Sequence, residues 1–283
     1  MSTHNKEEPG PEPDLELEKL ARRGLFRRTL APGTLAGLLL FGGLAPMPFL
    51  GLQGANTGLD TMAIALVVAL LVICLGVHEA AHAWVANQCG DSTAKDLGRI
   101  TLNPIPHIDP VMTIILPTML VLSNAGFLFG GAKPVPVAYH RLRNPLRDMM
   151  LVALAGPVSN FLLAILFALA IGIFDEFRIY DRDQMMFTIL QYGVHFNLLL
   201  AAFNMLPIPP LDGSRVMAWM LPSSLRSGYV ALERFGLLIL VGILIMPGPG
   251  SQVRALIWDF METMRVAVEW IVNPIVDMLG SVL

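Results

Sequence analysis

Charged side chains are absent from six long stretches of the chain, and these stretches determine the predicted architecture. They comprise residues 29–59, 61–77, 110–132, 149–174, 184–211 and 235–253. A helix needs roughly 20 apolar residues to cross the hydrocarbon core of a bilayer, and each stretch is near or above that length. We therefore expect an all-α polytopic membrane protein with about six membrane segments.

The two ends of the chain differ from this apolar body. Residues 1–28 begin acidic and proline-containing and end basic, which is typical of a disordered tail. Residues 29–253 are expected to form one membrane-embedded domain, with its core at 61–213. In residues 254–283 the charged positions give the first half an amphipathic pattern. That last segment is predicted either to lie on the membrane surface or to span it.

Basic residues predict the orientation of the segments. A cluster of arginines ends the tail just before the first apolar stretch, so the N-terminus is expected to be cytoplasmic in a multi-pass plasma-membrane protein. The next basic residues, which should lie on the same side, are Lys133, Arg141, Arg143 and Arg147. The apolar stretch 111–130 precedes them. We predict that it enters the membrane as a bent hairpin and returns on the same side, forming a small cytoplasmic-side β or re-entrant element. The alternative is an ordinary crossing helix.

Composition narrows the function class. Hydrophobic residues make up 54% of the 283 residues and charged residues only 14%, against roughly 25% in ordinary soluble domains. The net charge of −3 argues against a nucleic-acid partner and, with the apolar stretches, favours a lipid bilayer. Two cysteines cannot build a disulfide framework.

The clearest chemical signal is an HExxH motif formed by His78, Glu79 and His82 at the end of an apolar stretch. Histidines four residues apart share one face of a helix and can bind one zinc ion. Glu79 is then close enough to act on a water. A chance pair of surface histidines is the alternative. Ionisable residues at the edge of a membrane segment are costly unless they face a polar site, which favours the metal interpretation.

A catalytic zinc needs a third protein ligand. Cys74 shares the helix face, but it lies about 12 Å from His82 along the helix axis, too far for one ion to bind both. Asp212 is the better candidate, because it follows the apolar stretch that ends near Leu206 at a similar predicted depth. The prolines before it interrupt any helix there. The alternative is that Asp212 simply caps the next helix.

Several motifs in order resemble the site-2 protease family of zinc-dependent intramembrane metalloproteases, in its compact bacterial and archaeal form. They are the HExxH motif, a Gly-Pro-x-x-Asn element ending at Asn160, an N-x-x-P-x-x-P-x-D-G element over 204–213, and proline-rich stretches at 103–110 and 131–137. The resemblance covers residues 71–213. We find no stretch able to hold a PDZ or CBS domain, so regulation that depends on such a domain is not expected.

The resemblance implies cleavage of membrane-spanning protein substrates with one Zn²⁺ per chain. His78, His82 and Asp212 would bind the metal, and Glu79 would be the general base. Asn204 would lie near the substrate or the developing oxyanion, although a hydrogen bond between helices is an equal alternative. A non-hydrolytic transporter or metal-binding scaffold is the competing function, and it has no need of an acid between the two histidines.

The remaining candidates carry open alternatives. One candidate substrate-binding segment keeps N–H donors on one edge only, because two of its residues are prolines. It either binds an unwound substrate by strand addition or is an ordinary connection. The segment consists of Lys133, Pro134, Val135, Pro136 and Val137. Asn160, His107 and Asp109 either support the metal ligands or serve locally, Asn160 at a helix kink and the other two in a turn. The sequence leaves the oligomeric state open.

Overall fold

The computed structural model describes residues 58–116, 118–119, 130–176, 184–245 and 248–282. The predicted tail and nearly all of the first apolar stretch lie outside these ranges. The α-helices are α3 (Gly58–Gln88), α4 (Thr93–Asp96), α6 (Pro145–Glu176), α7 (Gln184–Asn204), α8 (Gly213–Met220), α9 (Ser223–Ala231), α10 (Gly236–Ile245) and α11 (Pro249–Val282). Short turns of other helix types are η2 (Ile105–His107), η3 (Pro110–Ile115), η4 (Tyr139–Arg141) and η6 (Leu232–Phe235).

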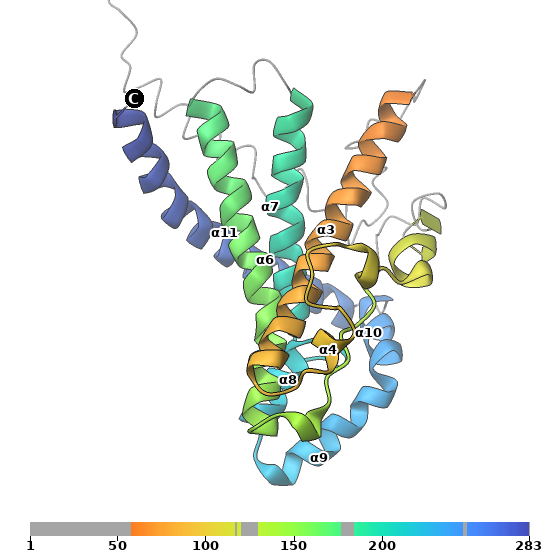
Figure 1. Cartoon of the computed structure of the whole chain (residues 1–283). Coiled ribbons are helices and arrows are strands. Elements are labelled where there is room, and N and C mark those ends of the chain that lie inside the picture. Colours follow the sequence, from red (N-terminus) through yellow and green to blue (C-terminus); the bar gives the residue numbers. More distant parts are fainter. Residues whose placement is uncertain (1–57, 117, 120–129, 177–183, 246–247, 283) are drawn as a thin grey trace, which may run out of the picture.

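Four long helices form the body of the molecule (Figure 1). Helices α3 and α7 run in one direction, and α6 and α11 run in the other. The short helices α4, α8 and α9 gather at the end where α6 begins. The site described below is therefore built where long apolar helices meet this cap of short elements.

Small side chains allow α6 and α7 to pack closely. Ala164 and Ala168 of α6 are fully buried against Val194 and Leu198 of α7 in the main apolar cluster. Small residues at such contacts let two helix backbones approach, which is the usual way that membrane helices associate. This contact holds α6 and α7 in fixed relation to each other.

Local sequence explains where the site helices begin and end. Helix α3 stops before Gly90, whose φ of +109° is a conformation that favours glycine. Helix α6 begins at Pro145, a residue suited to the first helical position. The backbone N–H of Asn144 donates to the Asp148 carboxylate at 2.7 Å and so caps that first turn.

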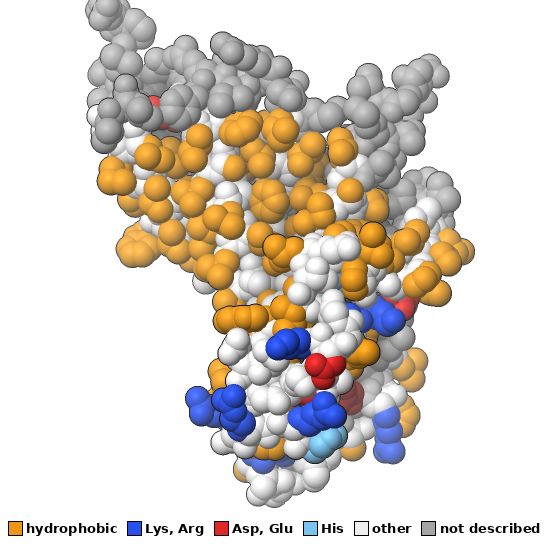
Figure 2. Space-filling view, viewed as in Figure 1, with side chains coloured by type: hydrophobic (Ala, Val, Ile, Leu, Met, Phe, Trp, Pro, Cys, Tyr) orange, Lys and Arg blue, Asp and Glu red, His pale blue; other side chains and the backbone are white. Residues whose placement is uncertain are grey.

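The expectation of a helical membrane protein is confirmed, but that of about six spans is not. Among the residues that the structure describes, three helices are long and apolar enough to cross a membrane, namely Val68–Gln88, Pro145–Glu176 and Met186–Asn204. Helix α10 has ten residues, which gives a length of about 15 Å and covers only half of the hydrocarbon core. The surface agrees with a membrane protein, because hydrophobic side chains cover one half of it and Lys and Arg gather toward the other end (Figure 2).

The predicted amphipathic segment 254–283 forms most of α11, a helix of 34 residues. Its buried residues Ile257, Met261, Val268 and Val272 belong to the same apolar cluster as α6 and α7. On the same helix, Arg265 pairs with Glu262 and Glu269. Pairing within the helix reduces the cost of placing these charges beside an apolar bundle.

The two ends of the predicted hairpin 111–130 lie together. The N–H of Gly131 donates to the Met112 carbonyl at 3.0 Å, and the Thr113 hydroxyl donates to the Gly131 carbonyl at 2.6 Å. Residues 120–129 lie outside the described ranges. No strand occurs among the described residues, so the β part of the prediction is not confirmed. Residues 130–138 are extended, but their N–H groups bond to side chains and to carbonyls of η2 and η3 instead of to a neighbouring strand.

Candidate metal centre

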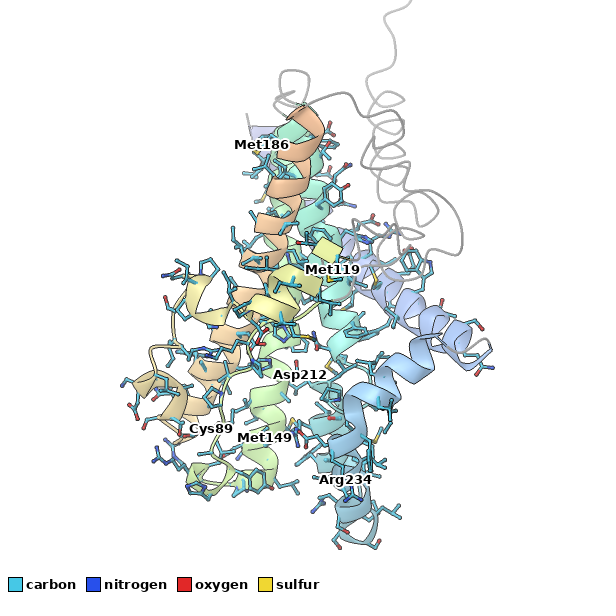
Figure 3. All side chains as sticks on the ribbon, turned by 90° about the vertical axis from the view of Figure 1, so that its right-hand side faces the viewer. Cys89, Met119, Met149, Met186, Asp212 and Arg234 are labelled. Atoms are coloured by element: carbon cyan, nitrogen blue, oxygen red, sulfur yellow. The ribbon has the colours of Figure 1, made fainter. Side chains whose placement is uncertain are left out.

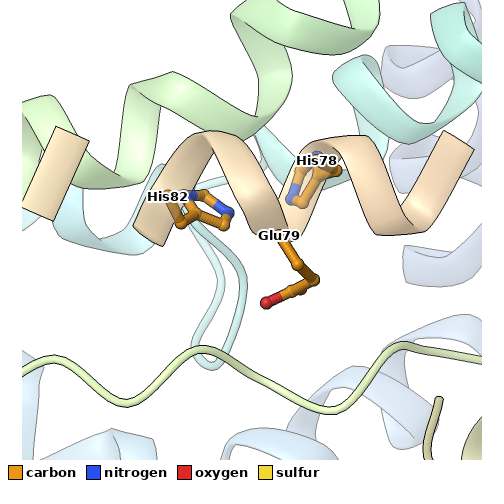
Figure 4. A group of neighbouring side chains, drawn as sticks. All are labelled: His78, Glu79 and His82. Atoms are coloured by element: carbon orange, nitrogen blue, oxygen red, sulfur yellow. The ribbon is translucent and has the colours of Figure 1, made fainter. Parts of the chain in front are cut away.

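Helix α3 presents His78, Glu79 and His82 on adjacent positions of its last turns (Figure 4). The two imidazole rings lie one turn apart, with their centroids 4.6 Å from each other, and both are buried. The ligand atoms of all three side chains lie within 4.8 Å of one another. This is a grouping that could hold a metal ion.

Asp212 completes this group from a distant part of the chain. Its Oδ2 atom lies 3.1 Å from Nε2 of His78 and 3.3 Å from Nε2 of His82. Although Asp212 immediately precedes α8, its side chain makes no capping hydrogen bond there. The carboxylate faces the histidines, as the metal interpretation expects and the simple capping interpretation does not.

The backbone before Asp212 explains its position. Pro207, Pro209 and Pro210 end α7 and prevent it from continuing as a regular helix. Gly213 packs so tightly on this turn that a Cβ atom there would overlap the Met205 carbonyl. Asp212 lies between Met186 near one end of the molecule and Arg234 near the other, on the Arg234 side (Figure 3).

Hydrogen bonds from α6 orient both imidazoles. Nδ1 of His78 bonds to Oδ1 of Asn160 at 2.5 Å, and Nδ1 of His82 bonds to the Val152 carbonyl at 2.7 Å. Both partners are acceptors, so each Nδ1 carries a proton and each Nε2 turns toward Asp212, where it can bind a metal when the ring is neutral. Metal-binding histidines are typically held in this way.

This donor set fits a zinc ion. Two bare imidazole nitrogens and a carboxylate oxygen repel one another at this distance unless a cation or proton lies between them. Tetrahedral zinc with ligands at 2.0–2.1 Å places neighbouring ligand atoms about 3.3 Å apart, close to the separations seen here. The residues present are therefore suited to the metal that the HExxH motif predicts.

Gly156 keeps the α6 side of this centre open. A Cβ atom at that position would lie 2.5 Å from Nε2 of both His78 and His82. Pro157 follows within the helix and donates no N–H to it. The atoms that lie nearest to Gly156 from other elements are those of the two histidines.

Glu79 points away from the histidines and toward the extended segment 130–138 (Figure 4). Its Oε2 atom accepts the N–H of Val135 at 3.0 Å. The N–H of Lys133, on the same edge of that segment, donates to the His107 carbonyl at 2.8 Å. Two donors of the predicted binding edge thus already have partners in this structure.

His107 is buried beside this segment. Its Nε2 donates to the Thr101 carbonyl at 3.1 Å, so Nδ1 is the bare nitrogen of the neutral ring. Burial lowers the pKa of His107, and the nearby positive charge of Arg99 acts in the same direction. The Arg99 guanidinium in turn donates to the Lys133 carbonyl. These residues hold the segment 133–137 near Glu79.

Two other candidates make local contacts in this structure. The Asn204 amide donates to the Leu200 carbonyl of its own helix at 2.9 Å. The Asp109 carboxylate accepts the N–H groups of Val111 and Met112 and so caps η3, as the turn interpretation expects. No described hydrogen bond connects either residue to His78 or His82.

Sequence reasoning missed two buried polar residues near the site. Asn197 of α7 is fully buried and bonds to Asn160 at 2.7 Å. Asp91, also fully buried, accepts the N–H of Ala138 at 2.6 Å and so holds the end of the extended segment. A polar residue inside an apolar helix is the signal that could have singled out Asn197. Asp91 carries no comparable signal.

Comparison with known proteins agrees with this geometry. The "Putative zinc metalloprotease YwhC" of Bacillus subtilis is 36% identical over 206 residues, covering 70% of this chain and 86% of that protein. The chain belongs to the site-2 protease family. Another family member, "Putative zinc metalloprotease Rip2" of Mycolicibacterium smegmatis, is 30% identical over 202 residues, which make up 70% of this chain and 73% of that protein.

A third member of the site-2 protease family matches a shorter region. "Putative zinc metalloprotease MJ0611" of Methanocaldococcus jannaschii is 44% identical over 68 residues, or 24% of this chain and 32% of that protein. No family model and no solved structure matches the chain. The relatives together support a zinc metalloprotease and do not favour a transporter or scaffold.

Proposed function

We propose that this protein is a zinc endopeptidase that cuts membrane-spanning segments of other proteins near the cytoplasmic face. The observation that carries the proposal is the meeting of Asp212 with His78 and His82 within 3.3 Å, at the inner end of apolar helices. A peptide bond inside a membrane is reached only by a site at that depth. Lys and Arg side chains gather toward one end of the molecule, which we take as the cytoplasmic end (Figure 2).

We assign His78, His82 and Asp212 as the ligands of one zinc ion per chain. When bound, zinc supplies Lewis-acid chemistry, which makes a water acidic near neutral pH and polarises the scissile carbonyl. The protein holds both rings in the required tautomer through Asn160 and Val152. Gly156 leaves the space that the ion and the water require.

Glu79 is the proposed general base. It lies beside the two histidines and is half-buried, so its carboxylate can receive a proton from the attacking water and return it to the leaving amine nitrogen. Its present bond to the Val135 N–H holds the carboxylate toward the extended segment. Release of that bond would leave both carboxylate oxygens free to act on water.

We further propose that the segment from Lys133 to Val137 binds the substrate. A helix hides its amides in its own hydrogen bonds, so the substrate must unwind, and an extended segment can hold the unwound strand. Pro134 and Pro136 remove donors from one edge, so the strand would add on the edge that carries the Val135 N–H. Substrate binding there would compete with Glu79 for this donor and would free the carboxylate for catalysis.

The membrane topology is part of the proposal. The hydrogen bonds of Gly131 with Met112 and Thr113 support a stretch 111–130 that begins and ends on one side. That arrangement keeps the basic residues from Lys133 to Arg147 on the cytoplasmic side with the N-terminus. Asn204 retains its proposed role near the oxyanion, through the second N–H of the amide whose first N–H donates to the Leu200 carbonyl.

A paired measurement on Glu79→Gln tests the enzyme. Purified wild-type protein and Glu79→Gln should each contain about one zinc per chain, because the three proposed ligands are unchanged. Only the wild type should release membrane-protein fragments when the two are compared by proteomics of membranes that contain them. Ser159→Ala, which loses only a hydrogen bond to the Gly156 carbonyl and contacts no proposed ligand, is the control that should keep both properties. Cleavage by Glu79→Gln would contradict the assigned base.

A further inference from the structure

We propose that Asn197 of α7 is a positioning residue of the metal centre, which acts through Asn160 to fix the tautomer of His78. The inference rests on the proposed zinc site and adds to it a residue that contacts none of the ligands directly. Asn160 and Asn197 are both fully buried, on α6 and α7 respectively. Together they connect the histidine helix with the two other helices that are long enough to span a membrane.

The contacts form an unbroken series. Nδ2 of Asn197 donates to the Gly193 carbonyl at 2.7 Å, and Oδ1 of Asn197 accepts from Nδ2 of Asn160 at 2.7 Å. Oδ1 of Asn160 then bonds to Nδ1 of His78 at 2.5 Å. Every step joins buried atoms, where a mismatched donor or acceptor is expensive.

The direction of each bond follows from the first one. A carbonyl only accepts, so the Gly193 carbonyl requires the NH₂ side of the Asn197 amide, which turns its oxygen toward Asn160. That oxygen requires the NH₂ side of Asn160, which turns the Asn160 oxygen toward His78. An oxygen at that place requires a proton on Nδ1 of His78, and Nε2 is left bare for a metal.

A second contact holds Asn197 in the same orientation. Its Nδ2 also lies 3.1 Å from Sγ of Cys74, one helical turn before His78 on α3. Asn160 Nδ2 additionally approaches the Cys74 carbonyl at 3.5 Å. A flipped Asn197 amide would place its oxygen against the Gly193 carbonyl, so the observed direction is the only one that satisfies its partners.

His82 provides an internal comparison. Its Nδ1 donates directly to the Val152 backbone carbonyl, without any side chain between them. Replacing Asn197 or Asn160 should therefore alter the His78 side of the centre and leave the His82 side unchanged. His78 thus depends on side chains for its orientation, whereas His82 depends on a backbone carbonyl.

The test is zinc affinity, measured by competition with a chelator on the full-length protein purified in detergent. Loss of an outer partner of a metal ligand costs about 10–100-fold in affinity. We expect Asn160→Leu to fall in this range and Asn197→Leu to lose about tenfold. Because both act on His78, the double variant should bind zinc no more weakly than Asn160→Leu alone. Ser159→Ala, on the same helix as Asn160, should bind zinc as the wild type does.

A merely structural role gives a different result. It would lower the unfolding temperature of the metal-free protein and leave zinc affinity unchanged, or reduce the affinity additively in the double variant. If Asn197→Leu does not fold, Asn197→Ser decides, because a serine hydroxyl can bond to the Gly193 carbonyl but is too short to reach Asn160. Failure of the wild type to bind zinc would overturn the proposed function. Wild-type binding with unchanged affinity in the folded Asn197 variant would overturn this inference alone.

Discussion

A methyl group on the α-carbon of Gly156 would lie 2.5 Å from Nε2 of His78. This distance is shorter than any normal contact, and the same methyl group would also meet His82. Helix α6 is thus shaped around the two imidazoles, and one added carbon atom should displace the atoms proposed to bind zinc.

Gly156→Ala should therefore lose its zinc. The methyl group forces the rings away from Asp212, and overpacking of this kind costs about 1–3 kcal/mol of stability as well. Metal analysis of the purified variant checks the prediction. The matched control is Gly172→Ala, where the new methyl would press on Val276 of α11, far along α6 from the site. The control should lose some stability and retain zinc, and a zinc-replete Gly156→Ala protein would contradict the proposed geometry.

Asp212→Asn should weaken zinc binding by more than about 100-fold, because removing a ligand should exceed the 10–100-fold effect of losing an outer partner. The amide has nearly the same shape as the carboxylate but lacks its charge. Chelator competition measures the change. Asp259→Asn, a change of the same kind on α11, should leave zinc affinity as it is. Equal affinity in both variants would exclude Asp212 as a ligand.

Val135→Pro should strongly reduce cleavage while zinc remains bound. The substitution removes the N–H that now meets Glu79 and that we propose for the substrate, and it leaves the three metal ligands untouched. A loss of at least about tenfold in cleavage rate is expected, since one hydrogen bond of about 1.5 kcal/mol corresponds to a factor of ten. Val135→Ala keeps the N–H and should cleave normally. Similar rates for the two variants would argue for an ordinary connection.

Asp91→Asn should destabilise the protein by about 1–3 kcal/mol, because a buried donor loses its acceptor. The Asp91 carboxylate accepts from Thr93 with one oxygen and from Ala138 with the other, whereas asparagine offers a single oxygen. Thermal unfolding of the detergent-purified protein measures the difference. Asp96→Asn, which alters an exposed bond to Ser92, should have little effect.

The Asp91 effect should depend on pH. Burial by itself raises the pKa of Asp91. Hydrogen bonds from Thr93 and Ala138 lower the pKa by more than burial raises it, so the pKa in the folded protein lies below the ordinary value. The stabilisation is therefore present above about pH 4 and is lost as the pH falls through the folded pKa. The gap in unfolding temperature between wild type and Asp91→Asn should narrow in acid. A gap that widens in acid would show that the pKa is shifted in the opposite direction.

Much of the site could be predicted from the sequence because its chemistry requires fixed residue types at fixed spacing. The four-residue interval places His78 and His82 on one helix face, and the prolines before Asp212 mark a break in the backbone at the matching depth. Support for the ligands was harder to predict. Gly156 and Asn160 stand out in the sequence, but which residues they face depends on how α6 crosses α3. Asn197 was missed because its partners lie on other helices.

The fold was predicted less completely than the site. The absence of charged residues identified α3, α6 and α7. A long helix without charged residues has few places in which to bury its apolar surface other than a membrane. The same criterion assigned a span to residues 235–253, where α10 ends after ten residues and Gly248 adopts a φ of +82°. Hydropathy does not register such a turn. In α11, the amphipathic pattern indicated an apolar face, but it did not show that this face belongs to the same apolar cluster as α6 and α7.

The bonds between Gly131 and the turn at Met112 and Thr113 have a consequence for how this family can vary. These hydrogen bonds join the two ends of the stretch. Residues can therefore be added or removed between those ends without moving the parts of the protein that lie outside them. The distance from α3 to Val135 is then independent of what lies between Met112 and Gly131. Relatives could adapt that stretch to different lipids or substrates and leave the hydrolytic machinery untouched.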